Sequence, residues 1–160
     1  MYKVKSFSKK DYNRFLSLAE EQAKLATCKR AKCGAVIVKD YGIIGIGFNS
    51  PPGNSKPLCH VDKKTLHEKV TDKTCCVHAE RRAMDNALSD FNKKVLKNST
   101  IFFSRVDEKG HVVFSGKPYC TRCSKDALDV GISKWVLRHD SGIYTYDAGE
   151  YHELSRNYNG

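Results

Sequence analysis

Two short motifs that lie far apart in the sequence constrain the fold most. They are His78-Ala79-Glu80 and Cys120-Thr121-Arg122-Cys123, and together they provide an imidazole, two thiols and a carboxylate. Zinc in proteins prefers nitrogen and sulfur ligands in a tetrahedral arrangement, and a zinc ion that performs chemistry keeps one position open for water. His78, Cys120 and Cys123 would fill the other three positions. The chain is therefore expected to fold so that the two motifs meet.

Both motifs are predicted to stand at the start of a helix. Pro118-Tyr119 leads into the cysteine pair, and helical residues follow over 124–130 and end at Gly131. The positive end of a helix dipole favours the thiolate form of cysteine, which is the form that binds metals. A second helix is predicted to begin at His78. Glu80 lies in its first turn, so we expect the Glu80 carboxylate to reach a metal-activated water and to move protons without being a ligand.

The rest of the sequence alternates between helical and strand patterns. An amphipathic helix is predicted over 8–26, with Ser8 and Asp11 as a capping pair at its start. Short turns at 40–42 and 140–142 predict two antiparallel hairpins. The predicted strands cover 33–39, 43–48, 100–106, 112–114, 133–138 and 143–146, before a last helical segment from 147. This order predicts an α/β fold with a central mixed sheet and helices on its faces.

Length and charge limit the classes of protein to consider. A chain of 160 residues has the size of one domain, so 1–160 is expected to be a single domain. No apolar run is long enough to span a membrane, and 1–5 lacks the apolar stretch of a secretory signal, so we expect a cytoplasmic location. The formal net charge of +10 is compatible with a nucleotide phosphate or a nucleic acid as partner. Because the basic residues are dispersed, a small anionic substrate fits at least as well as a polynucleotide.

The chain contains seven cysteines. Their odd number, the Cys-x-x-Cys pair and the absence of a signal favour reduced thiols and metal binding over disulfides. Residues 50–76 are polar and long for a plain loop, and a metal ion would order them. Candidate ligands for a second, structural zinc site are Cys59, His67 and Cys75, with Cys28, Cys33, His60 and Cys76 as further candidates. The alternative is buried free cysteines and surface histidines.

Three longer segments extend the pattern beyond the metal motifs. They are Gly34-Ala35-Val36-Ile37-Val38, Gly45-Ile46-Gly47-Phe48-Asn49-Ser50-Pro51-Pro52-Gly53 and Cys76-Val77-His78-Ala79-Glu80. These segments resemble the deoxycytidylate deaminase branch of the cytidine deaminase superfamily, and the resemblance runs over about residues 33–132. It implies a three-layer α-β-α sandwich around a mixed five-stranded sheet, in an enzyme that forms a homo-oligomer.

The resemblance also implies an activity and roles for particular residues. The activity is the zinc-dependent hydrolytic deamination of a cytosine nucleotide, dCMP to dUMP. The zinc would be held by His78, Cys120 and Cys123, with Glu80 as the proton shuttle. Asn49 would contact the sugar of the substrate.

Other substrate contacts are candidates on their position alone. The backbone N–H of Ala79 is a candidate donor to the carbonyl oxygen of the base, because the first amides of a helix have no partner within it. Tyr119 is a candidate to stack on the base. Arg105, Lys117 and Arg122 are the basic residues nearest in sequence to the metal ligands, and one or more of them is a candidate for a 5′-phosphate.

Three departures from the family pattern keep alternatives open. Tyr119 stands between Pro118 and Cys120, where the family has proline directly before the cysteine. The segment 104–117 is longer than usual, and the turn at 140–142 predicts the antiparallel last hairpin of the free cytidine deaminases. The alternatives are therefore a free cytidine deaminase, and a deaminase acting on a base in RNA or single-stranded DNA, such as a tRNA adenosine or cytidine. A metal-binding module without turnover is a third alternative, which the presence of Glu80 disfavours.

Overall fold

The computed structural model describes residues 7–28, 31–54 and 76–158. Within them one sheet has the strand order β2-β1-β3-β5-β6, and β4 pairs with β3 beside this path. The strands are β1 (Lys32–Lys39), β2 (Gly42–Phe48), β3 (Thr100–Val106), β4 (Val112–Val113), β5 (Lys134–His139) and β6 (Gly142–Asp147). Strand β3 pairs antiparallel with β1 and parallel with β5, so the sheet is mixed, as predicted.

The sheet has six strands, and the expectation of five was wrong in that one respect. The chain folds back after β3, and β4 makes a short antiparallel ladder that pairs Arg105 with Val113 and Val106 with Val112. This extra strand lies in the longer segment at 104–117. It confirms the strand predicted at 112–114.

Both predicted hairpins are present. Asp40 and Tyr41 connect β1 to β2 and have φ angles of 48° and 66°. Positive φ at both central residues is the feature of two-residue turns that match the twist of the flanking strands. The second hairpin joins β5 to β6, and Gly142 takes a φ of 136° that residues with a side chain rarely adopt.

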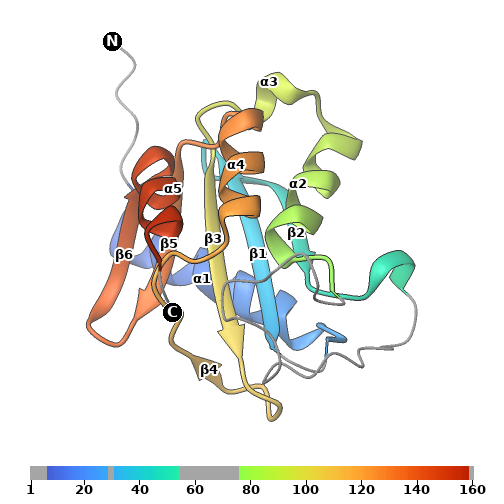
Figure 1. Cartoon of the computed structure of the whole chain (residues 1–160), viewed down its shortest axis with the longest axis vertical. Coiled ribbons are helices and arrows are strands. Elements are labelled where there is room, and N and C mark those ends of the chain that lie inside the picture. Colours follow the sequence, from blue (N-terminus) through green and yellow to red (C-terminus); the bar gives the residue numbers. More distant parts are fainter. Residues whose placement is uncertain (1–6, 29–30, 55–75, 159–160) are drawn as a thin grey trace.

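The helices form two outer layers, which gives the three-layer arrangement that was expected. They are α1 (Lys9–Lys24), α2 (Ala79–Asp90), α3 (Lys93–Leu96), α4 (Thr121–Val130) and α5 (Ala148–Arg156), with a short 3-10 turn η1 at Pro52–Asn54. Figure 1 shows α1 behind the sheet and α2, α4 and α5 in front of it. The predicted cap of α1 is confirmed, because Ser8 Oγ accepts from the Asp11 amide at 3.1 Å and Asp11 Oδ2 accepts from the Ser8 amide at 2.9 Å.

Each face of the sheet has its own apolar core. On the α1 face, Phe15 and Leu16 pack with Phe102 and Val136. On the other face the core includes Ile37, Ile101, Trp135, Ala83, Ala87 and Ala127, together with Cys120 and Cys123. The candidate cysteines are thus built into the wall of a packed core, which restricts their movement.

Helix α2 lies unusually close to strand β2. A Cβ atom added at Gly47 would come within 2.5 Å of the Ala83 nitrogen and 2.6 Å of the Ala79 oxygen. Ala79, Ala83 and Ala87, the small residues on this face of α2, therefore pack against Gly45 and Gly47 of the strand. Asn86 adds a polar anchor, because its Oδ1 accepts from the Ile46 amide at 3.0 Å. These contacts set the height of α2 above the sheet.

The short helix α3 was not predicted from the sequence. Among the described residues, no helix combines the length and the apolar character needed to cross a membrane.

Candidate metal centre and active site

The two motifs meet where helices α2 and α4 begin. His78 is the N-cap residue of α2 and Cys120 is the N-cap residue of α4. His78 Nδ1 lies 3.2 Å from Cys123 Sγ and 3.4 Å from Cys120 Sγ, and the two sulfur atoms are 3.2 Å apart. These three groups are the metal-binding cluster found among the described residues. One ion could contact all of them, because their ligand atoms lie within 4.8 Å of one another.

The first turn of α4 fixes the two sulfur atoms. Cys120 Sγ accepts from the Cys123 amide at 3.4 Å, which caps the helix, and the Cys120 carbonyl accepts from the Ser124 amide at 3.0 Å. Helix α4 begins at Thr121, earlier than the predicted 124–130 segment, so Cys123 lies within its first turn. Amide groups at a helix start stabilise negative charge, and this environment suits a thiolate.

The chain before α2 is held by the segment that follows β2. Val77 and Ser50 exchange two backbone hydrogen bonds, at 2.9 Å and 3.3 Å, directly before His78. Arg82 then reaches back from α2, and its Nη2 donates to the Pro51 carbonyl at 3.0 Å. The His78 ring is therefore positioned from both sides of the helix start.

Glu80 is a buried carboxylate beside this cluster. It is 6% exposed, and its Oε2 lies 3.7 Å from Cys123 Sγ. Burial raises the pKa of Glu80, because the charged form loses its hydration. A carboxyl group of raised pKa beside such a cluster can both accept and donate a proton.

In the metal-free protein, the three groups of the cluster have different pKa shifts. The hydrogen bond from the Cys123 thiol, followed by the His78 contact, lowers the pKa of Cys120 to about 4. The same pairing with the Cys120 sulfur, together with burial, raises the pKa of Cys123 well above its ordinary value. The hydrogen bond to Cys120 raises the pKa of His78 to about 9. Cys120 is thus a thiolate paired with an imidazolium, while Cys123 keeps its proton.

Cys33 is a further thiol near this site. It stands opposite Arg105 in the β1–β3 ladder. Burial, followed by the charge of Glu80, raises the pKa of Cys33 to about 12, and Arg105 opposes this shift. Cys33 is therefore a neutral group beside the buried carboxylate, and sequence reasoning did not place it there.

Two of the residues predicted to contact the substrate, Asn49 and Ala79, are buried. Asn49 is buried at the end of β2, where its Oδ1 accepts from the Cys33 amide at 2.9 Å and its Nδ2 donates to the Ala31 carbonyl at 2.6 Å. An amide side chain has two donor hydrogens and two acceptor lone pairs, so one of each is left over from these bonds. Ala79 is the first residue of α2 and is fully buried.

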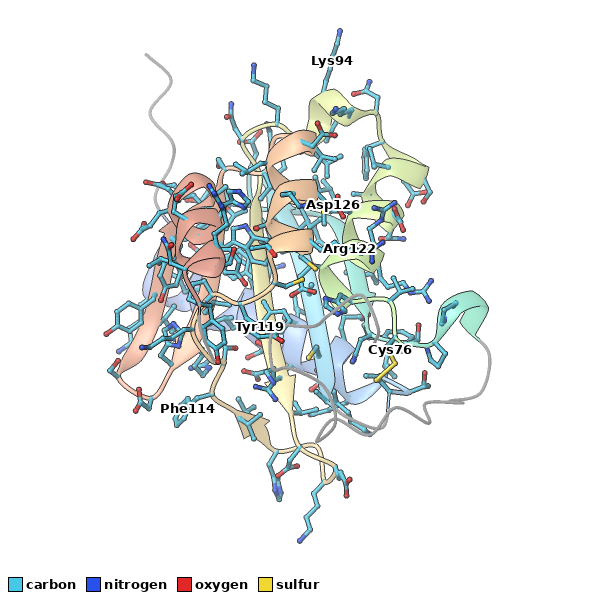
Figure 2. All side chains as sticks on the ribbon, in the orientation of Figure 1. Cys76, Lys94, Phe114, Tyr119, Arg122 and Asp126 are labelled. Atoms are coloured by element: carbon cyan, nitrogen blue, oxygen red, sulfur yellow. A yellow bond between two sulfur atoms is a disulfide. The ribbon has the colours of Figure 1, made fainter. Side chains whose placement is uncertain are left out.

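Tyr119 directly precedes the cysteine pair. Its ring meets the Tyr158 ring edge to face, with centroids 5.0 Å apart. Figure 2 shows Tyr119 and Arg122 at the start of α4, with Cys76 across the site from them. Arg122 is exposed, and its charge acts on His78. The candidate stacking ring is therefore held by the end of the described chain.

The residues predicted to hold a second zinc ion, Cys59, His67 and Cys75, lie outside the described residues. Cys76, directly before the His78 motif, is joined to Cys28 by a disulfide. This pairing differs from the expectation of reduced thiols, and it removes both sulfur atoms as thiolate ligands. Cys33, Cys120 and Cys123 are free.

Two histidines outside the metal motifs are partly buried and bonded. His152 Nδ1 lies 2.8 Å from Ser124 Oγ, and His139 is bonded to the Ser115 carbonyl and the Tyr146 hydroxyl at 2.8 Å each. His111 differs from them, because its side chain is 75% exposed.

Two solved structures share the fold. They are the dCMP deaminase from the cyanophage S-TIM5 in apo form, with a TM-score of 0.57, and the same protein in complex with dCMP and dUMP, with a TM-score of 0.59. Each is 21% identical in sequence and covers 81% of this chain and 82% of its own.

Sequence comparison finds relatives and a family. The chain is 27% identical over 136 residues to a deoxycytidylate deaminase of Mycobacterium phage D29, covering 79% of this chain and 93% of that protein. It is 28% identical over 131 residues to the deoxycytidylate deaminase of Saccharomyces cerevisiae, where the match covers 76% of this chain but spans only 35% of the yeast protein. Residues 9–139 match the cytidine and deoxycytidylate deaminase zinc-binding region. This match covers most of the chain and includes the whole histidine–cysteine cluster, and the chain therefore belongs to the zinc-binding cytidine and deoxycytidylate deaminase family.

Proposed function

We propose that this protein hydrolyses dCMP to dUMP and ammonia. The observation that carries the proposal is the buried Glu80 carboxylate 3.7 Å from Cys123 Sγ, beside a cluster of one imidazole and two sulfur atoms. The relatives named deoxycytidylate deaminase support the choice of substrate.

The donor set fits a zinc ion. One nitrogen and two sulfur atoms converge from two helix starts, and a fourth position would remain for water. We assign the ligand roles to His78, Cys120 and Cys123. Zinc, when bound, acts as a Lewis acid that lowers the pKa of water toward neutrality.

Glu80 is assigned the proton transfers. Its carboxylate takes a proton from the attacking water and delivers it to the ring nitrogen next to the amino-bearing carbon. The oxygen of the water becomes bonded to that carbon, and the carbon–nitrogen bond breaks after Glu80 delivers the second water proton to the amino group. The balance is one water consumed and one ammonia released, which converts the cytosine ring to uracil. The raised pKa of Glu80 suits a group that gains and loses a proton in each cycle.

The remaining residues around the cluster are proposed to bind the substrate. The Ala79 amide donates to the carbonyl oxygen of the base, and Tyr119 packs on the base. Asn49 contacts the sugar with the donor hydrogen and lone pair that its backbone bonds leave over. Arg105 and Arg122 are the cations close to the site, and they support an anionic substrate over an uncharged nucleoside.

The test is ammonia release from a panel of substrates. Purified zinc-loaded protein is incubated with dCMP, CMP, deoxycytidine, cytidine and a single-stranded oligonucleotide at equal cytosine concentration. We expect the highest kcat/KM for dCMP, with one dUMP formed per ammonia. Faster turnover of the uncharged nucleosides would identify a free cytidine deaminase, and faster turnover of the oligonucleotide would identify a polynucleotide deaminase. Either result would overturn the proposal, as would zinc binding without ammonia from any substrate.

We also propose that the chain is one domain that assembles with copies of itself in the cytoplasm. Three apolar side chains on or next to α2 and α4 are each about 40% exposed: Leu88 in α2, Phe91 directly after α2, and Leu128 in α4. Exposed apolar side chains of this kind support an interface. A reducing compartment would keep Cys120 and Cys123 available for the metal, and the same compartment would favour the reduced form of the Cys28–Cys76 pair. Light scattering at several concentrations tests the assembly, and a strictly monomeric protein would contradict it.

A further inference from the structure

Helix α5 and the residues directly after it make contacts on both sides of the cysteine pair. It follows the antiparallel strand β6 and runs back along α4, and Figure 1 shows the two helices side by side in front of the sheet. Residues 148–156 lie beyond the segment that matches the family, which ends at residue 139. The family match therefore does not cover the contacts that α5 makes.

The first contact is a buried polar network at Ser124, the residue after Cys123. Ser124 Oγ donates to the Thr121 carbonyl at 3.0 Å and lies 2.8 Å from His152 Nδ1 and 3.3 Å from Ser155 Oγ. Ser155 Oγ donates to the His152 carbonyl at 2.8 Å. Ser124 is 1% exposed and Ser155 is fully buried, so these bonds are protected from water.

The hydrogen count at Ser124 links the direction of its hydroxyl to the tautomer of His152. A hydroxyl group has one hydrogen, and a carbonyl oxygen can only accept. If Ser124 donates to the Thr121 carbonyl, His152 must donate its Nδ1 hydrogen to Ser124. His152 then holds the first turn of α4 by a directed bond, rather than only packing against it.

Two aromatic contacts flank this network. Before the cysteine pair, Tyr158 meets Tyr119 with ring centroids 5.0 Å apart. Next to His152, Tyr151 is 5% exposed and stacks on Trp135 at 4.0 Å with an interplanar angle of 12°. Tyr151 belongs to the same buried core cluster as Cys120 and Cys123.

We propose that α5 and the residues directly after it form a positioning element for the metal-binding sulfur atoms, in which His152 of α5 holds Ser124 on one side of the cysteine pair and Tyr158, two residues after α5, holds Tyr119 on the other. The inference rests on the proposed metal-binding role of Cys120 and Cys123. His152 is a positioning residue and touches neither metal nor substrate. Groups that orient metal ligands from behind commonly change metal affinity by about 10-fold to 100-fold when they are removed.

The test measures zinc release from the intact protein. Zinc-loaded wild type and His152→Ala are mixed with a chromophoric chelator, and the rate of zinc transfer is followed by absorbance. We expect release from His152→Ala to be about 10-fold faster or more. His152→Asn can restore a donor near the Nδ1 position and should return most of the loss. His111→Ala is the matched control, because that side chain is 75% exposed and pairs with Asp107 in the turn between β3 and β4, and its release rate should equal that of the wild type.

Further measurements separate positioning from general stability. Thermal unfolding of the metal-free proteins reports the structural effect alone, and a positioning role requires faster release beyond any change in Tm. Ser124→Ala removes only an oxygen atom and provides the same test if His152→Ala does not fold. The double variant should release zinc no faster than the faster single variant, because both changes remove one bond. Equal release from wild type and both single variants would overturn the inference. A wild type that binds no zinc would instead overturn the proposed function.

Discussion

Glu80 Oε2 lies 3.7 Å from Cys123 Sγ, although the two residues belong to different helices. The carboxylate approaches the cluster from the first turn of α2, and the sulfur from the first turn of α4. Glu80 is therefore close enough to act on a water at the open position of the metal site. It is not needed as a ligand, because the proposed ligands His78, Cys120 and Cys123 would provide three.

Glu80→Gln should separate metal binding from turnover. The amide keeps the size of the side chain but cannot carry a proton between water and base. We expect unchanged zinc content by elemental analysis and a kcat reduced by about 10²-fold to 10⁴-fold or more. Glu108→Gln, at an exposed position in the loop between β3 and β4, is the control and should retain full activity. Substantial turnover by Glu80→Gln would remove Glu80 from the mechanism.

Zinc binding should release about two protons per ion at pH 7. In the metal-free protein His78, with a pKa raised to about 9, is protonated, and Cys123, with a pKa raised by its contact with Cys120, is a thiol. Cys120, with a pKa of about 4, has already lost its proton. Zinc affinity should therefore fall as the pH falls from 8 to 6, by about 100-fold per unit.

Calorimetric titration in buffers of different ionisation enthalpy measures the number of released protons. His78→Ala should reduce that number to about one, since only the Cys123 proton is then displaced. A release of three protons by the wild type would contradict the thiolate assignment of Cys120.

Gly47→Ala should disturb the site by displacing helix α2. The added methyl group would come within 2.5 Å of the Ala83 nitrogen, which is helix backbone and cannot rotate away. Helix α2 must then move, and we expect a loss of about 1–3 kcal/mol in the free energy of unfolding. Activity should fall as well, because His78 and Glu80 stand at the start of that helix. Gly149→Ala is the matched control, since no atom lies within 4 Å of its added Cβ. Urea unfolding of both variants makes the comparison, and equal stabilities would argue against the close packing.

The Cys28–Cys76 disulfide should be detectable and stabilising. It joins positions that are 48 residues apart, and closing a loop of that size typically stabilises a protein by about 2–4 kcal/mol. Peptide mapping without reductant should find the linked pair. A reductant should destabilise the wild type by that amount and leave Cys28→Ser/Cys76→Ser unchanged. If both cysteines react with alkylating reagents in the oxidised protein, they are reduced thiols, as the sequence favoured.

Much of the fold was predictable because local sequence and tertiary structure agree. Strand β3 covers the predicted 100–106, where β-branched and aromatic residues dominate. The last hairpin was predicted from its turn, and Gly142 takes the positive φ that the turn requires. Helix α3 was missed because its one turn, Lys93–Leu96, is too short to show a helical period.

The candidate site was predictable only as far as spacing carries information. Cys120 and Cys123 are neighbours on one helix turn whatever the rest of the chain does, and the structure brings His78 to them. Cys33, Tyr151 and His152 reach the site through strand pairing and helix packing. No local pattern marks such residues, since their role depends on contacts between distant segments.

Strands β3 and β5 form the one parallel pair among the described strands, and this pair separates the sheet into two parts. Of the pairings in the described sheet, only the β3–β5 ladder, from Thr100–Lys134 to Phe103–Leu137, joins the first half of the sheet to the hairpin that ends it. His78 stands on one side of this seam, and the cysteine pair is on the crossover helix that leads to the other. An ion bound between them would act as a cross-link between two folding units. Removal of the ion should therefore speed amide hydrogen exchange in the β5–β6–α5 unit more than in the other parts of the protein.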